Sequence, residues 1–414
     1  TADFIGGLSQ FNLKDLNVHT SNRDFEIQAN GSSHIRGKNT DAIDINLQRV
    51  LLSHNAWNIL ETQLPNLYSS IPTEVPRLGK VEIKGDVSLN KAVSQIDLTA
   101  VTDAGTAKAK MQIDEGGRYT TSIKGSDINV VKILPTSPLI RTNLTLTVQG
   151  TYNHNAPDKK LPLRGNFSGE ATNTELLGYT YQTIRLDGNY APESYEGTIS
   201  LDDPNGQLTI DAIYSTGDIP QYTINLDADS LNLYAMNLIS IHEGSTFSTE
   251  LNGDIKGIDF NHMSGKININ NTTIHREGDD YTIESINIYS TDPKEIDPTN
   301  AQQQHLSIGS DFVAGSIIGD FTYQTLGESL KWHLYHHLPS LCNHKHTHHL
   351  GNNNCNLSFD INDVEPLKEF LLLPIDIEKA ITIKAFLNDN NQKIWLKTEV
   401  PQLTFSEQEL RGME

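Results

Sequence analysis

The chain is poor in cysteine, methionine and tryptophan, and it has no long apolar run. Its 414 residues include 2 Cys, 4 Met and 3 Trp. Two cysteines exclude a disulfide-dense scaffold, in which several bridges replace a large core. The longest apolar stretch lies around Phe370–Leu373, far short of the roughly 20 residues that a membrane-spanning helix needs. The chain begins at Thr1 without a secretory leader, so we expect it to be an internal segment whose membrane anchor lies outside it.

Positive charge is scarce as well. Lys and Arg number 31 against 52 Asp and Glu, which gives a formal charge of −21. Nucleic-acid binding needs a basic surface that displaces counterions, so we expect no nucleic-acid partner. The same charge balance disfavours adsorption to anionic lipid head groups.

The motifs of common enzyme classes are missing. The sequence contains no G-x-S-x-G elbow, no H-E-x-x-H helix and no glycine loop suited to a phosphate. No carboxylate pair stands out as an acid and a base, because Asp202-Asp203 and Asp279-Asp280 fall in predicted turns. We therefore expect no enzymatic activity and no cofactor.

Short alternating strands are abundant. Hydrophobic residues make up 36% of the chain, and they occur in runs of about eight residues between turn signals such as Asp203-Pro204-Asn205-Gly206. This pattern predicts a mainly β fold, with a long, curved antiparallel sheet that has one apolar and one polar face. An uncovered apolar face normally marks a ligand or partner site, whereas a closed sandwich, barrel or solenoid would bury the same residues. Alternation selects as candidate lining residues Leu144, Leu146, Val148, Leu208, Ile210, Ile267, Ile269, Ile381 and Ile383.

One pattern recurs along the chain: a strand that ends near an Asp, a short apolar helix, and another strand. Repetition of this kind indicates a stacked array. We predict that Asp127 and Asp229 cap the helices that follow them. Copies of the pattern lie at Tyr119–Gly150, Tyr222–Gly253, Leu357–Leu387 and, more loosely, Ile43–Val87, with helices at Asn129–Leu134, Leu233–Ile239, Pro366–Leu373 and Asn55–Leu64. The approximate repeat units are 1–118, 119–221, 222–354 and 355–414, with inserts at 292–305 and 341–356.

The two cysteines and a cluster of histidines fall close together. In an oxidising compartment, an isolated pair such as Cys342 and Cys355 favours a disulfide, whereas a reducing compartment favours a metal site. The spacing of His344, His346 and His348 matches no standard zinc site, so we expect adventitious rather than specific metal binding.

Glycines and aromatic residues give weaker signals. Gly85, Gly125, Gly150, Gly188 and Gly253 fall at strand ends or kinks, which predicts turns and bulges. Aromatic residues make up 7% of the chain, and the three tryptophans are scattered. A sugar-binding β-solenoid would cluster aromatic residues on one face, and the sequence does not show such a cluster.

The stretch Leu161–Ser215 resembles the TamB family as found in Bacteroidota. The resemblance is carried by LLGYTYQTIRLDGNY, then GTISLDDPNGQLTIDA, and then YTINLDADSLNLYAMNLI. These are degenerate β-repeat patterns, and they are similar also to those of the broader AsmA-like group. The resemblance covers most of the chain and is strongest from Tyr119 to Asp292.

The resemblance implies a periplasmic β-groove, U-shaped in section, in a cell-envelope protein anchored in the inner membrane. In this family the groove is linked to passive phospholipid movement between the inner and outer membranes and to outer-membrane protein assembly. The partners it implies are phospholipid and, through the parent chain, an outer-membrane barrel of the Omp85 type. Two alternatives remain: a scaffold or chaperone that binds clients by β-strand addition, and the sugar-binding solenoid.

Overall fold

The computed structural model describes residues 3–7, 10–36, 39–152, 163–259, 261–292, 303–337, 351–363, 365–371, 375–376, 380–405 and 408–413. The protein is mainly β, with 66% strand and 11% helix, and its antiparallel sheet is not closed into a barrel. The predicted fold class is therefore confirmed. In the described part of the chain, no helix is both long and apolar enough to cross a membrane.

The chain forms two compact units. Unit 1 comprises Thr1–Pro204 with Ala235–Ile239, and unit 2 comprises Asn205–Tyr234 with Ser240–Glu414. The unit boundary falls within one predicted repeat, and the repeat bounds stay a prediction.

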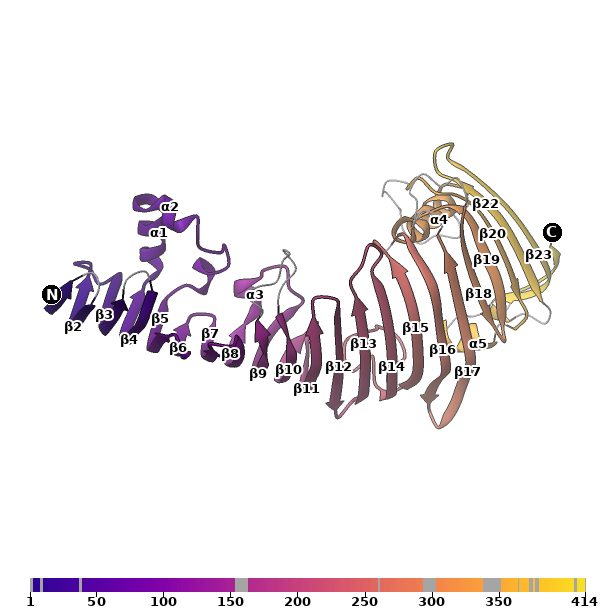
Figure 1. Ribbon diagram of the computed structural model, residues 1–414. Helices are drawn as coiled ribbons and strands as arrows, with labels where there is room; N and C mark the ends of the chain where they lie inside the picture. The colour runs from indigo at the N-terminus through magenta and orange to yellow at the C-terminus, as the bar shows by residue number, and fades with distance from the viewer. Residues whose placement is uncertain are drawn as a thin grey trace. The chain divides into compact units, whose positions relative to one another are not determined.

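Unit 1 is an antiparallel meander in which each strand pairs with the next (Figure 1). Tight turns such as Asp103-Ala104 connect neighbouring strands, which is why no long crossover is needed. The strands are β1 (Asp3–Gly7), β2 (Gln10–His19), β3 (Phe25–Arg36), β4 (Asn39–Leu52), β5 (Val81–Asn90), β6 (Val93–Thr102), β7 (Gly105–Asp114), β8 (Arg118–Asn129), β9 (Leu139–Tyr152), β10 (Leu163–Leu176), β11 (Tyr179–Ala191) and β12 (Ser194–Asp203).

Unit 2 is by itself also an antiparallel meander, in which β22 pairs with β20. The short β21 and the last strand, β24, both pair with β23. The strands are β13 (Gly206–Ser215), β14 (Gln221–Leu231), β15 (Thr246–Gly257), β16 (Met263–Arg276), β17 (Asp279–Thr291), β18 (Gln304–Ser310), β19 (Val313–Asp320), β20 (Asn354–Ile361), β21 (Ile375–Asp376), β22 (Ile381–Asn388), β23 (Lys393–Phe405) and β24 (Gln408–Met413). The predicted inserts are therefore shorter than expected, since residues 304–305 and 354–356 lie in strands.

The strand register separates an apolar face from a polar face in each unit. Directly opposed residues on neighbouring strands share a face of the sheet. In unit 1 one apolar row runs Gly85, Leu98, Ala109, Ile123, Leu146, Gly169, Leu186 and Ile199, and the row behind it runs Asp86, Asp97, Lys110, Ser122, Thr147, Ser168, Asp187 and Thr198. In unit 2 an apolar row runs Ala212, Ile224, Gly253, Ile267, Ile288, Ile308, Gly315, Phe359 and Ile383.

The helices of unit 1 lie where strands β4 and β8 end (Figure 1). The predicted helix at Asn55–Leu64 is confirmed as α1 (His54–Gln63), which Ser53 caps by accepting a hydrogen bond from the amide of Ala56 at 3.3 Å. Trp57 of α1 is buried and donates to the Gly79 carbonyl at 2.6 Å. This bond ties α1 to the return segment that contains the remaining short elements, α2 (Pro65–Tyr68) and the 3₁₀ turn η1 (Pro76–Leu78).

In unit 2 a longer helix, α4 (Tyr323–His337), packs on the apolar face. Leu326 of α4 joins a buried cluster with Ile317, Leu357 and Leu387 of strands β19, β20 and β22. None of the four helices predicted from the sequence falls here, so α4 is a helix that the sequence pattern missed. A second helix, α5 (Glu365–Leu371), pairs its Glu369 carboxylate with the Arg276 guanidinium of β16.

Asp127 and Asp229 do not cap helices as predicted. Asp127 lies at a β-bulge with φ of 54°, and its amide donates to Asn143 Oδ1 at 2.8 Å. Asn129 caps the short α3 (Val130–Ile133) instead. Near Asp229, the bulge residue is Ser230, whose amide donates to Ser248 Oγ at 3.0 Å. In these two copies a left-handed residue that breaks the strand ladder thus stands where the sequence predicted a helix cap.

The helix predicted at Leu233–Ile239 is wrong. The structure has turns there, and Asn237 adopts a φ of 58°. A left-handed residue cannot continue a right-handed helix, so the segment stays a compact turn. The third copy fits better, because the Asp363 carboxylate accepts a hydrogen bond from the Glu365 amide at 2.9 Å where α5 begins.

Candidate apolar binding groove

The apolar face of unit 1 contains a groove of about 810 Å³ over strands β7 to β12. A volume of this size is typical of small-molecule sites. Two lining residues keep a large exposed fraction, 36% for Met111 and 41% for Tyr195, so the groove is open to solvent. The lining residues are Met111, Ile113, Tyr119, Thr121, Leu146, Val148, Tyr152, Leu163, Phe167, Leu186, Tyr190 and Tyr195, and none of them is charged.

Strand alternation places these side chains on one face. Leu146 and Val148 alternate with Thr145 and Thr147, which point to the opposite, polar face. Val148 is directly opposite Phe167 on β10, and Leu186 of β11 belongs to the same row as Leu146. The groove is therefore a product of register, because a shift of one residue would exchange the two faces.

The predicted lining residues all lie on the apolar face of their own unit. Leu146 and Val148 line the groove, and Leu144 lies on the same face one pair further along β9. In unit 2, Leu208 and Ile210 lie on β13, Ile267 and Ile269 on β16, and Ile381 and Ile383 on β22. The structure thus brings two of the nine residues into the unit 1 groove, and their role as lipid-lining residues stays a prediction.

Sequence reasoning missed the aromatic part of the groove. Four tyrosines and Phe167 gather here from five strands, although the aromatic residues are scattered in the sequence. Alternation on β11 would have marked Leu186 and Tyr190, since both follow the period of two. The prediction that Gly150 and Gly188 form turns or bulges is wrong, because both lie within regular strand pairs.

The cysteine and histidine predictions fall at the edge of the described residues. Cys342, His344, His346 and His348 lie outside them. Cys355 is a free thiol that is 1% exposed. Because Cys342 lies outside the described residues, its pairing with Cys355 stays a prediction. Cys355 lies on β20 in the buried cluster under α4. In the described part of the chain, no group of three or more His, Cys, Asp or Glu side chains is placed to hold a metal ion.

Cys355 should be unreactive until unit 2 unfolds. Desolvation, with a smaller effect of Asp389, raises the pKa of the Cys355 thiol to about 12, so almost none of it is thiolate at pH 8. In a Cys342→Ser background, we expect an aromatic disulfide reagent to label no thiol in native protein and one thiol in denaturant. Rapid labelling of native protein would show that α4 does not cover Cys355.

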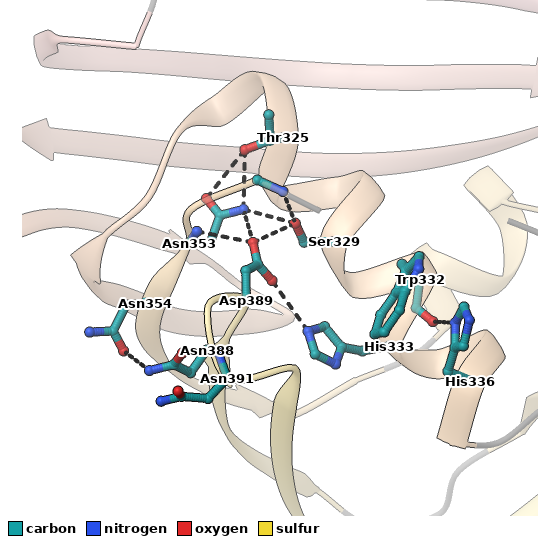
Figure 2. Close-up of polar contacts among 11 residues, drawn as sticks. Thr325, Ser329, Trp332, His333, His336, Asn353, Asn354, Asn388, Asp389 and Asn391 are labelled. Atoms are coloured by element: carbon teal, nitrogen blue, oxygen red, sulfur yellow. Dashed lines mark hydrogen bonds and ion pairs between the residues drawn. The ribbon is translucent and has the colours of Figure 1, made fainter. Parts of the chain in front are cut away.

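A second cluster of polar side chains lies beneath α4 (Figure 2). The Asp389 carboxylate, in the turn after β22, accepts hydrogen bonds from Ser329 Oγ at 2.8 Å and from Asn353 Nδ2 at 2.8 Å, and it lies 3.2 Å from His333 Nε2. These four side chains are between 0% and 3% exposed. The cluster is closed to solvent, and it ties α4 to the end of the β22–β23 hairpin.

No protein-family model matches this chain, and no curated protein or solved structure matches it. The likeness to TamB therefore rests on the sequence patterns alone.

Proposed function

We propose that the groove holds phospholipid acyl chains and lets them move passively along the apolar face of unit 1. The observation that supports this is an open, uncharged groove continuous with an apolar row across the strands of unit 1. Transfer of one methylene from water to such a surface contributes about 0.8 kcal/mol. The hydrocarbon, rather than the head group, is therefore the part of the ligand that the protein shelters.

The dimensions suit a chain that lies across the strands. Neighbouring strands are about 4.8 Å apart, so the five intervals from β7 to β12 span about 24 Å. Half of a bilayer's hydrocarbon core is about 15 Å, which is the depth that one acyl chain fills. One chain thus covers about three strand intervals, and successive rows of Leu, Ile and Val offer it similar surroundings. Similar surroundings mean low barriers, as passive movement requires.

The setting follows from the resemblance to TamB and is part of the same proposal. The chain would lie in the periplasm within a protein anchored in the inner membrane, and it would work with an Omp85-type barrel in supplying or assembling the outer membrane. The phosphate-binding motifs of ATPases are missing from the sequence, which favours passive transfer.

Photo-crosslinking tests the proposal. A photoreactive residue at Leu146 should capture phospholipid from vesicles, and one at Thr145 should not, because the two side chains point to opposite faces of β9. Ile267 and Lys266 form the matching pair in unit 2. We expect at least about tenfold more lipid adduct at the apolar positions, scored by mass spectrometry. Equal capture on both faces, or capture of protein alone, would overturn the proposal and favour a strand-addition scaffold.

A further inference from the structure

In one row of the groove, the directly opposed residues on four neighbouring strands are a tyrosine, two glycines and a second tyrosine. Tyr119 of β8 is opposite Gly150 of β9, which is opposite Gly165 of β10, which in turn is opposite Tyr190 of β11. The two tyrosines lean toward each other over the glycines, and their hydroxyl groups form a hydrogen bond. The pair thus bridges the groove, although 71 positions separate its members in the sequence.

Gly165 leaves the room that this bridge needs. A Cβ atom on Gly165 would lie 2.6 Å from Tyr190 Oη and 2.0 Å from the Gln149 carbonyl oxygen. The same device recurs in the next row, where a Cβ on Gly188 would lie 2.5 Å from Phe167 Cζ. The Phe167 and Tyr190 rings are stacked, with centroids 6.4 Å apart and an interplanar angle of 23°. Because the glycines have no side chains to fill the groove, the aromatic rings lie over them and form its surface here.

The row lies next to the turns at one end of the strands. Tyr119 follows the β7–β8 turn at 115–117, and Tyr190 precedes the β11–β12 turn at 192–193. Tyrosine suits such a boundary because its ring is apolar and its hydroxyl is polar. Toward the strand centres the groove is lined by Leu146, Val148 and Leu186 instead. The groove thus has a polar group, the hydroxyl pair, at its solvent-exposed end near the turns. Toward the strand centres its surface is apolar.

Among the described residues, the hydroxyl pair keeps one donor hydrogen that its mutual hydrogen bond does not use. Each phenol carries one donor hydrogen, and the bond between them uses one of the two. Desolvation, together with the hydrogen bond to Tyr119, raises the pKa of Tyr190, so the hydroxyl stays protonated at neutral pH. In an apolar groove the remaining hydrogen gains most from an acceptor that the ligand itself brings. The described lining has no charged side chain, so this acceptor is an uncharged oxygen.

We propose that the Tyr119–Tyr190 pair binds the ester carbonyl region of a diacyl glycerophospholipid. The acyl chains then lie on Leu146, Val148 and Leu186, and the charged head group stays in water beyond the turns. This inference rests on the proposed function and adds one specific binding site to an otherwise uniform apolar surface. A sugar fits less well, because its many hydroxyl groups need more polar partners than Thr121 and the tyrosine hydroxyls provide.

The test compares two ligands that differ only in the carbonyl groups. Dihexanoyl phosphatidylcholine and its dihexyl ether analogue, both below their micelle concentrations, are titrated against the whole chain loaded with a fluorescent phospholipid. We expect the ester to compete about fivefold more tightly than the ether, the ratio that one neutral hydrogen bond provides. In the Tyr119→Phe/Tyr190→Phe variant this ratio should fall to about one, while the ether binds as before.

Unit 2 offers a matched control. Tyr214 and Tyr222 are directly opposed on its apolar face, with ring centroids 5.1 Å apart. The Tyr214→Phe/Tyr222→Phe variant should keep the fivefold ratio, and its loss would move the ester site to unit 2 and overturn the inference. Equal binding of ester and ether to the unsubstituted protein would overturn the inference and leave the proposed function standing. If neither lipid displaces the probe and no photo-adduct forms at Leu146, the proposed function is overturned as well.

Discussion

Replacing Leu146 by glutamate should weaken phospholipid binding to unit 1 by about 100-fold or more. Leu146 lies in the middle of the apolar row, between Ile123 of β8 and Gly169 of β10, and its side chain lines the groove. A carboxylate at this position would meet an acyl chain without a compensating partner, which costs several kcal/mol. Binding is measured by titration of a fluorescent phospholipid, and folding by the far-ultraviolet circular dichroism spectrum.

The neighbouring residue provides the control. Thr147→Glu adds the same charge on the polar face, where the cross-strand neighbours are Ser122 and Ser168. We expect its lipid affinity to change by less than about twofold, because an exposed charge on this face is solvated. If Thr147→Glu weakens binding as much as Leu146→Glu, then net charge or misfolding is responsible, and the groove is not the site.

Alternation in the sequence was enough to predict the strands and their faces. Leu144, Leu146 and Val148 share a face because the side-chain period of a strand is two. Short turns then force antiparallel neighbours, so the apolar faces of successive strands coincide without long-range information. This local determination is why the fold class and the apolar face were predictable.

The helices were less predictable because distant residues stabilise them. Helix α4 is held by Asp389, which lies 60 positions from Ser329 and 56 from His333. No local pattern reveals such partners. Asp127 was misassigned for a different reason: aspartate suits both a helix cap and a left-handed bulge, and only the neighbouring strand, through Asn143, decides between them.

The Tyr119–Tyr190 pair in the groove could also not be predicted from the sequence. Tyr119 and Tyr190 are brought together by the register of four strands, and the two intervening glycines have no meaning until that register is known. Glycine within a strand predicts a bulge or a close approach equally well. Here the close approach is that of an aromatic ring, as the contact between Gly188 and Phe167 shows.

The two units treat the same kind of apolar face differently. In unit 1 the face over β7 to β12 stays open as the groove. In unit 2 the face over β19, β20 and β22 is covered by α4, whose Leu326 packs against Leu357 and Leu387. Under the proposed function, acyl chains on unit 2 would have room only on the strands that α4 leaves uncovered, and the stability of α4 would set how much of the face is available.

Replacing Asp389 by alanine should lower the free energy of unfolding of unit 2 by about 3–5 kcal/mol, because it leaves buried donors without their acceptor. The Asp389 carboxylate accepts hydrogen bonds from Ser329 Oγ and from the side-chain Nδ2 of Asn353. It also accepts one from the backbone amide of Asn353 at 3.0 Å. Urea unfolding is followed by the fluorescence of Trp332 on α4, in a background with Trp57 and Trp395 replaced by phenylalanine.

Asn391 in the same turn is the control for this prediction. Its side chain is exposed (Figure 2). Its backbone amide donates a hydrogen bond to Asn388 Oδ1 at 2.9 Å, and this bond survives the change to alanine. We expect Asn391→Ala to change the free energy of unfolding by less than about 0.5 kcal/mol, as surface substitutions usually do. Asp389→Asn keeps one carbonyl acceptor and should fall between the two. Equal stability of Asp389→Ala and Asn391→Ala would mean that apolar packing alone holds α4, and that the helix is free to leave the face when a lipid competes for it.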